Sequence, residues 1–472
     1  MRVNAENCTK KALIAHLFRR AGFGITFDEL ADYLPIDYGD IVEQLLYPEL
    51  QPELDQDVVR RYNIDQNSLM LIESSQANWM YRIINTKRPL EEKMSLFWHD
   101  LFATAYSKLN HAKAVVNQTD TFRRCGLGNF RTLLLELSRD PAMIFWLDNK
   151  DNHKGSPNEN YGRELLELFS LGIGNYSEED VKACAKAFSG WTIANSVYMS
   201  ERASRDSIWP HGRLDWQFVY MPEDHDDSDK TFLGQTGRFN GDDVIDIIVD
   251  NPATSWFIAS KLYSFFVSDK PDESVIQYLS QEFSKTGGDI RKVMRSLFLS
   301  ETFASDKTRL ARVKSPAELV AGTAKLAGSH SFPDWTTVNL AMDANFMGQE
   351  ILNPPTVEGW HTGIEWIDTG NLVERINSTA LEIGDTQQPG VRSIINKVRT
   401  HGGVCTAKDL VDLSLDAMCQ FEVSATTKES LLKYADMKGP LYFDKEDQIG
   451  CSEQRVGEML QLIVATREYQ LA

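Results

Sequence analysis

The sequence lacks the short motifs that usually announce an enzymatic reaction. Its 472 residues contain no Walker A sequence, no His-Glu-x-x-His, no Gly-x-Ser-x-Gly, no EF-hand loop and no complete Rossmann glycine fingerprint. The nearest approach to that fingerprint, Gly172-Ile173-Gly174, has no third glycine and does not follow a predicted strand. These absences argue against P-loop ATP hydrolysis, dinucleotide chemistry and zincin proteolysis.

Paired cysteines and long apolar runs are also missing. The 6 cysteines form no Cys-x-x-Cys pair, which disfavours a structural zinc site or a thioredoxin-like motif. No run of about 18 apolar residues occurs, so we predict no membrane-spanning helix. The short apolar run 12–18 contains His16 and lacks the small-residue cleavage site of a signal peptide. We therefore expect a cytoplasmic protein, or an exported one if the N-terminus has been trimmed.

Positive charge is scarce. Lys and Arg number 49 against 68 Asp and Glu, which gives a formal net charge of −19. An acidic field of this size repels phosphate backbones, so we expect no nucleic-acid partner. The 10 Trp, 23 Phe and 15 Tyr argue against disorder, and the length exceeds what one small core needs.

Helical periodicity dominates the chain. Apolar residues recur at three- and four-residue spacing in residues 11–20, 68–85, 90–104 and 129–137, and again from 242 onward. Residues 191–237 interrupt this pattern with aromatics, Asp, Gly and Ser. We predict a mainly α fold, a large multi-helix body with an irregular β-hairpin and loop excursion near 191–237. Its parts would be an N-terminal helical part (1–190), an acidic loop-rich insertion (191–240) and a C-terminal helical part (241–472), packed as one unit.

Residues 148–172 form the strongest candidate segment for chemistry. Glu164 and Glu167 lie one turn apart on one face of a predicted helix, so they could bind a cation or divide acid and base roles. The alternative is a surface pair between Arg163 and Glu167 at i, i+4. We expect Ser156 to cap this helix, with Glu159 as its capping-box partner.

Two histidines have suggestive settings. His99 lies in a helix dense in aromatics, where either a site role or a buried core role fits. His225 and Asp226 lie in an acidic stretch, since residues 215–250 contain ten Asp and Glu against Lys230 and Arg238. This stretch is either a cation site built from carboxylates and imidazole or a solvated loop.

Arginines recur in two adjacent pairs, Arg19-Arg20 and Arg123-Arg124. Either pair could hold an anionic substrate group through bidentate contacts. In an acidic protein, pairing with interior carboxylates is more common, and we favour that structural role for both pairs.

Several longer strings carry a family resemblance. They are residues 16–24, 97–99, 140–143, 158–161, 163–168, 187–191, 225–226, 230–234 and 353–355, together with Val357, Gly359, Trp360 and Arg375. In these strings the chain resembles the bacterial domain-of-unknown-function family 1800 over nearly its whole length. The resemblance implies a predominantly helical protein, often exported, with a neighbouring partner that resembles alkaline phosphatases and sulfatases.

These observations favour an enzyme with an acidic site, assisted by a divalent metal, with hydrolysis as the reaction type. Glu164, Glu167, His99 and Arg163 are the predicted catalytic residues, and His225, Glu164 and Asp226 are the predicted metal ligands. The alternative is a non-enzymatic binding or scaffold partner of a phosphatase- or sulfatase-like protein, with the stretch around Trp360 and Trp366 as its docking surface. Carbohydrate binding or cleavage is a third hypothesis, since loop aromatics stack on sugars and paired carboxylates cleave glycosides.

Overall fold

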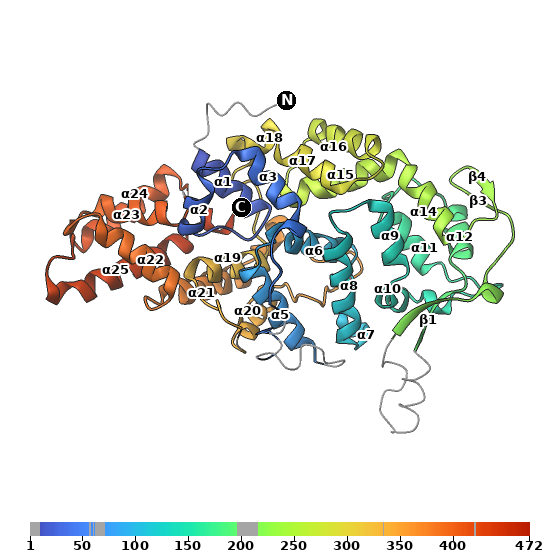
Figure 1. The fold of residues 1–472 in the computed structure, drawn as a ribbon, viewed down its shortest axis with the longest axis horizontal. Coiled ribbons are helices and arrows are strands. Elements are labelled where there is room, and N and C mark those ends of the chain that lie inside the picture. The colour runs from blue at the N-terminus through green and yellow to red at the C-terminus, as the bar shows by residue number, and fades with distance from the viewer. Residues whose placement is uncertain are drawn as a thin grey trace, which may run out of the picture.

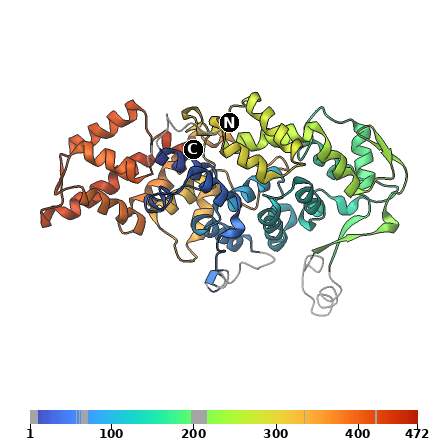
Figure 2. The same ribbon diagram turned by 45° about the horizontal axis from the view of Figure 1, so that its top comes forward.

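Helices make up most of the computed structural model, which describes residues 10–55, 58–59, 61, 71–195, 216–333, 335–419 and 422–472. The predicted fold class is confirmed: the described residues form 23 α-helices and only two-stranded sheets, and they are 63% helical. The molecule is elongated, with the C-terminal helices at one end and the hairpin region at the other (Figures 1 and 2).

The N-terminal half supplies the middle of the molecule and the hairpin end. Its central helices are α1 (Lys10–Arg20), α2 (Phe27–Tyr33), α3 (Tyr38–Leu46), α5 (Ile72–Asn85), α6 (Pro89–Leu101), α7 (Tyr106–Leu109) and α8 (Ala112–Cys125). Towards the hairpin end follow α9 (Phe130–Ser138), α10 (Pro141–Trp146), α11 (Asn160–Glu167), α12 (Glu178–Ala187) and α14 (Gly241–Asp250).

The C-terminal half returns along the molecule to its other end. It begins with α15 (Pro252–Phe266), α16 (Glu273–Lys285), α17 (Ile290–Phe298) and α18 (Glu301–Ala304). It continues with α19 (Pro316–Ala327), α20 (Thr337–Phe346), α21 (Thr369–Gly384), α22 (Pro389–Thr400), α23 (Ala407–Ala417), α24 (Ala425–Met437) and α25 (Glu446–Val464).

The strands pair as antiparallel hairpins. β1 (Trp191–Asn195) pairs with β2 (Trp216–Tyr220), and β3 (Lys230–Phe232) pairs with β4 (Gln235–Gly237). Leu233 and Gly234 join β3 to β4 with positive φ angles of 46° and 81°, which match the right-handed twist of a two-residue hairpin. β5 (Val404–Cys405) and β6 (Leu441–Tyr442) form the third pair. The first two hairpins confirm the predicted excursion near 191–237.

Two hydrophobic clusters hold the helices together. One joins α1–α3, α6 and α9–α12 to α14–α17, and the other joins α5 to α19–α25. The first cluster therefore contains residues from both sides of residue 240, so helices of the N- and C-terminal parts share one core.

One predicted helix start is wrong. The capping box at Ser156 does not form, because Ser156 lies in an isolated bridge with His153. The side-chain oxygen of Asn158 accepts from the backbone N–H of Asn160 at 3.0 Å, and α11 begins at Asn160. Glu159, the N-cap residue, makes no side-chain capping hydrogen bond.

Candidate functional site

The predicted catalytic residues on α11 are engaged in contacts with neighbouring segments. Arg163 reaches Glu178 with both terminal nitrogens, at 2.8 and 2.7 Å, and Glu159 at 3.3 Å. The alternative pairing of Arg163 with Glu167 is wrong, since Glu167 accepts instead from the Tyr176 hydroxyl at 2.6 Å. Burial and the neighbouring charge of Glu167 raise the pKa of Glu164. These contacts tie α11 to α12 and to the turn between them.

His99 is a core side chain. It is fully buried, with its ring 5.5 Å from that of Trp79 and 5.3 Å from that of Trp360. Neither ring nitrogen has a hydrogen-bond partner, and burial lowers the pKa of His99 to about 3. The imidazole is therefore neutral and packed, the second of the two roles that its sequence setting allows.

The acidic stretch around His225 is organised by internal hydrogen bonds. His225 is 5% exposed and its Nδ1 lies 3.0 Å from the carbonyl oxygen of Ser189, while Asp226 accepts from the backbone and hydroxyl of Ser228. Among the described residues, no three His, Cys, Asp or Glu side chains form a group that could hold a metal ion. The structure therefore does not bring His225, Asp226 and Glu164 together as a metal site.

Trp360 and Trp366 do not form the predicted docking surface. Each is only 5% exposed, and together with Val313 they form a small hydrophobic cluster of their own. Gly359, with φ of +90°, lets this segment approach α6 closely, where the backbone N–H of Trp360 donates to Asp100 at 2.9 Å.

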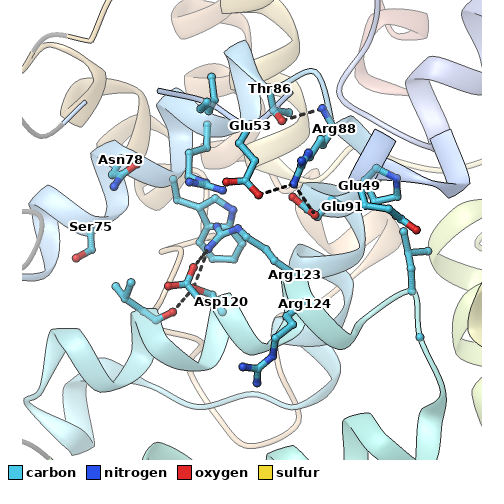
Figure 3. Close-up of a pocket in the computed structure, with 18 of the residues that line it drawn as sticks. Glu49, Glu53, Ser75, Asn78, Thr86, Arg88, Glu91, Asp120, Arg123 and Arg124 are labelled. Carbon is cyan, nitrogen blue, oxygen red and sulfur yellow. Dashed lines mark hydrogen bonds and ion pairs between the residues drawn. The ribbon is translucent and has the colours of Figure 1, made fainter. Parts of the chain in front are cut away.

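A large cavity lies elsewhere, between α5, α6 and α8. Its volume is about 730 Å³, and polar side chains predominate on its walls (Figure 3). Pro89 at the first position of α6 and the acidic residues Glu91 and Glu92 in its first turn are typical of a helix start, because carboxylates there face the positive end of the helix dipole. The helix start therefore places Glu91 on the cavity wall, while the adjacent Glu92 is fully buried and does not line the cavity.

Glu92 is fully buried and fully satisfied. Its two oxygens accept from Arg123 Nε at 2.9 and 3.0 Å, from Arg82 Nε at 3.1 Å and from the Trp79 indole at 3.0 Å. Burial opposes ionisation, but the charges of Arg123 and Arg82 outweigh it and hold the pKa of Glu92 below its ordinary value. Glu92 is therefore a permanent negative charge.

Glu91, the preceding residue, is in the opposite situation. Its side chain is 14% exposed, and its nearest cation is Arg88, whose Nη1 lies 3.8 Å from Oε1. Burial, and then the charge of Glu92, raise the pKa of Glu91 to about 7. Such a carboxyl exchanges protons near neutral pH, which an acid–base catalyst requires.

Fixed arginines frame the cavity around Glu91. Arg88 donates to the Gln51 carbonyl from Nε at 2.8 Å and to Glu53 from Nη1 at 2.9 Å, which fixes its guanidinium at the rim (Figure 3). Arg123 donates to Asp120 as well as to Glu92, and Arg291 donates to Glu49 at 2.8 Å. Positive charge is thus held in place on several sides of the cavity.

Sequence reasoning missed this site for an identifiable reason. The Glu91-Glu92 pair follows Pro89 and so looks like an ordinary helix start, and Arg123 contacts Glu92 across 31 residues. The Arg123-Arg124 pair was the available signal. Arg123 does pair with an interior carboxylate, as expected, whereas Arg124 pairs with the exposed Glu136 at 2.9 Å.

The fold and the cavity describe a large, mainly helical protein with carboxylates and arginines on the wall of one cavity. A family model described as a protein of unknown function, DUF1800, matches residues 16–471, so the chain belongs to this family. The resemblance seen in the sequence motifs is thereby confirmed. Neither the comparison with curated proteins nor that with solved structures gave a match. No helix among the described residues has the length and apolar character needed to cross a membrane.

Proposed function

We propose that this chain is an acid–base enzyme, a hydrolase, whose reaction takes place in the cavity between α5, α6 and α8. The observation that carries the proposal is the contrast between two adjacent carboxyls. Glu92 is buried and held ionised by Arg82 and Arg123, whereas Glu91 lines the cavity and has a pKa of about 7. Environments that separate the pKa values of neighbouring acids are a recurring mark of acid–base sites.

Glu91 would act first as acid and then as base. In its protonated form it gives its proton to the leaving-group oxygen as the bond to that oxygen breaks. The resulting carboxylate then takes a proton from the attacking water, which restores the acid and completes the addition of one water molecule. Arg88, fixed by Gln51 and Glu53, would orient a negatively charged group of the substrate beside Glu91.

The Glu91→Gln variant tests the catalytic role. Gln cannot transfer the proton, so kcat/KM is expected to fall by about 10²- to 10⁴-fold. The measurement is hydrolysis of a panel of 4-nitrophenyl carboxylates, phosphates, sulfates and glycosides across pH 5–9. In the unmodified chain we expect a limb of the pH profile near 7, where Glu91 titrates.

Glu73→Gln is the matched control, because Glu73 is an exposed carboxylate on α5. It is expected to leave the rate and the pH profile unchanged. No turnover of any panel member by the unmodified chain, or an unchanged rate in Glu91→Gln, would contradict the proposal.

The stability of the Glu91→Gln variant gives a test that needs no substrate. The folded chain holds the Glu91 proton up to about pH 7, whereas the ordinary pKa of Glu is 4.5, so Glu91 makes the chain less stable as pH rises between these values. Removal of the charge is expected to raise the free energy of unfolding by about 1–3 kcal/mol at pH 8, allowing for solvent screening, and to change little at pH 4. Urea unfolding at both pH values measures the difference, and a gain that is equal at both would contradict the assigned pKa.

A binding role is the second candidate, and one exposed apolar face supports it. Trp335, Met342 and Phe346 lie at helical spacing on and before α20 and are 53%, 47% and 60% exposed. A phosphatase- or sulfatase-like partner would cover this face. Phe346→Asp should then abolish binding of that partner in calorimetry while Glu91→Gln retains it, and equal binding by both variants would remove this candidate.

A further inference from the structure

The interior between α1, α6 and α19 holds more positive than negative charge. Glu318, the capping-box residue of α19, is buried and ion-paired with Lys93 of α6 and with Arg312. Four further cations, Arg19, Arg20, Lys314 and Arg375, interact electrostatically with this group. Two further carboxylates act on these cations, Asp269 on Arg20 and Glu422 on Arg19.

None of these four further cations has a carboxylate partner within 4 Å in the described part of the chain. Arg20 is fully buried and donates only to the Thr308 carbonyl, at 2.7 Å. Arg375, also fully buried, donates to Gln470 at 2.8 Å and to the Lys314 carbonyl at 2.9 Å, and Lys314 donates to the Tyr469 carbonyl at 2.7 Å. Neutral oxygens thus take the place of counter-ions.

Several guanidinium N–H groups in this interior have no acceptor at all. Buried nitrogens without a partner are Nε and Nη1 of Arg20, Nη1 of Arg375, Nε of Arg312 and Nε of Arg19. Buried N–H groups are normally paired, and a buried charge normally has a counter-charge, because each unmet group costs free energy. An acceptor that carries negative charge would therefore stabilise this arrangement.

A small cavity lies where such an acceptor would fit. Its volume is about 60 Å³, and Arg19 of α1, Lys314, Lys325 and Glu318 line it together with apolar side chains. Glu318 is already paired with Lys93 and Arg312, and Lys325 is paired with Glu29 at 3.3 Å, so Arg19 and Lys314 are the cations left to face the cavity. Arg19 makes no hydrogen bond or ion pair with any described residue.

A second small cavity, which Arg312 lines, is unsuitable for an anion. Its volume is about 110 Å³, but Asp100, Asp269 and Glu358 line it together with Lys261. These three carboxylates outnumber the two cations on the cavity wall, Lys261 and Arg312, so the cavity would repel negative charge. The 60 Å³ cavity, with three cations and one neutralised carboxylate, is the electrostatically favourable one.

We propose that the 60 Å³ cavity between α1 and α19 binds a small monovalent anion, either a halide or a carboxylate group, held by Arg19 and Lys314. The site is separate from the Glu91 cavity and does not rest on the proposed reaction. Binding would supply counter-charge to Arg19 and Lys314 and an acceptor for the buried Nε of Arg19, so the stability of the folded chain would rise with anion concentration.

Calorimetric melting of the full chain at constant ionic strength tests this inference. The chain is dialysed into sodium gluconate, whose polyhydroxylated chain is too large for the cavity, and the gluconate is replaced stepwise by sodium chloride or by sodium acetate. A saturable rise in Tm of about 2–5 °C is expected in at least one series. A rise with chloride alone identifies an inorganic anion, a rise with acetate alone identifies a carboxylate ligand, and no saturable rise in either series overturns the proposal.

Arg19→Gln locates the effect. It removes a cation that has no protein partner, so the anion-dependent rise in Tm is expected to disappear. Arg238→Gln removes one positive charge from a side chain that is 79% exposed, and should leave the rise intact. An equal rise in Arg19→Gln would contradict the proposed location.

Bromide gives a second measurement that does not depend on any variant. Crystals of the unmodified chain grown in sodium bromide should give an anomalous scattering peak in the cavity beside Arg19 and Lys314 if the calorimetric series respond to halide. For a response to acetate alone, planar density of a carboxylate is expected at the same place. An empty cavity under the responding condition would overturn the proposal.

Discussion

Replacement of Glu318 by Gln is expected to lower the free energy of unfolding by about 3–5 kcal/mol. The Glu318 side chain is 4% exposed, and its Oε1 is ion-paired with Lys93, which is fully buried, and with Arg312. Its Oε2 accepts from the backbone N–H of Ser315 at 2.7 Å, which starts α19. Gln would leave two buried cations without a counter-charge and would turn an N–H group towards one of these donors.

The pH dependence of unfolding gives this prediction a second readout. Burial alone would raise the pKa of Glu318, but Arg312 and Lys93 outweigh it and lower the pKa to about 2. A depressed pKa contributes stability above the ordinary value of 4.5, and that stability is lost as pH falls from 4.5 towards 2. The unmodified chain should therefore lose stability across this window more steeply than Glu318→Gln does.

Glu136→Gln is the control for Glu318→Gln. Glu136 also pairs with an arginine, Arg124, but the two side chains are 40% and 63% exposed. Surface pairs of this kind contribute about 0–1 kcal/mol, so little change is expected in urea or thermal unfolding. A loss in Glu318→Gln no larger than that in Glu136→Gln would contradict the central role of the buried carboxylate.

The Glu318→Gln variant also connects the buried charges with the proposed anion. Without the Glu318 carboxylate, the interior keeps Lys93 and Arg312 as well as the unpaired cations around Arg20 and Lys314. The uncompensated positive charge is then larger, so the rise in Tm with chloride or acetate should be larger than in the unmodified chain. In Arg19→Gln, by contrast, the rise in Tm should disappear.

Local patterns in the sequence were sufficient to predict most of the helices. Asp140 caps α10 with Pro141 at its first position, and Ser177 caps α12 with Asp180 as its capping-box partner. These signals are local because a cap and the first turn of a helix lie within four residues. Before α11 the local pattern is misleading, because Ser156 forms a bridge with His153 and does not cap the helix.

The candidate site could not be predicted in the same way, because its contacts join distant residues. Glu92 meets Arg123 across 31 residues, and Lys93 meets Glu318 across 225. Residue type also did not decide the role of His99, since the sequence around a histidine among aromatics can be the same in a core as in an active site. Only the three-dimensional surroundings, two indoles and no hydrogen-bond partner, separate the two roles.

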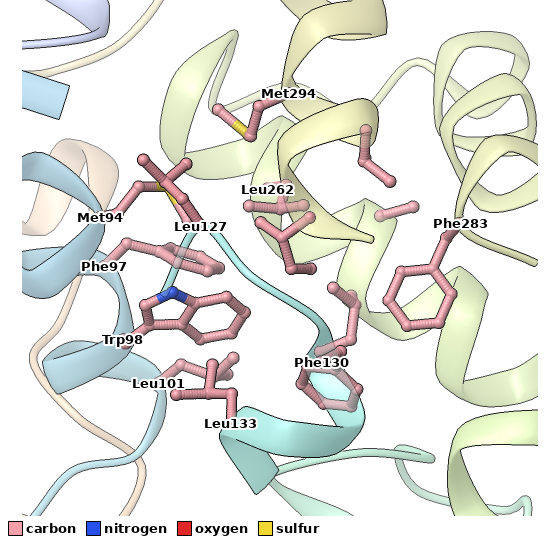
Figure 4. Close-up of a cluster of buried hydrophobic side chains, with 14 of the residues drawn as sticks. Met94, Phe97, Trp98, Leu101, Leu127, Phe130, Leu133, Leu262, Phe283 and Met294 are labelled. Atoms are coloured by element: carbon pink, nitrogen blue, oxygen red, sulfur yellow. The ribbon is translucent and has the colours of Figure 1, made fainter. Parts of the chain in front are cut away.

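Trp98, next to His99 in the same string, carries the second large prediction. Trp98→Ala is expected to lower the free energy of unfolding by about 3–5 kcal/mol, because truncation of a fully buried aromatic leaves a cavity in a packed core. The indole stacks on Phe102 with ring centroids 5.3 Å apart, and it lies 4.6 Å from the ring of Phe97 and 6.1 Å from that of Phe130 (Figure 4). Its Nε1 donates to the Gly126 carbonyl at 2.9 Å.

Trp98→Phe separates the packing contribution from that of the hydrogen bond. Phe keeps much of the aromatic contact with Phe102 and Phe97 but leaves the Gly126 carbonyl without its donor, so a loss of about 1–2 kcal/mol is expected. Urea unfolding of both variants measures the two losses. Equal losses in Trp98→Ala and Trp98→Phe would show that the hydrogen bond, and not the packing of α6 against α9, carries the contribution of Trp98.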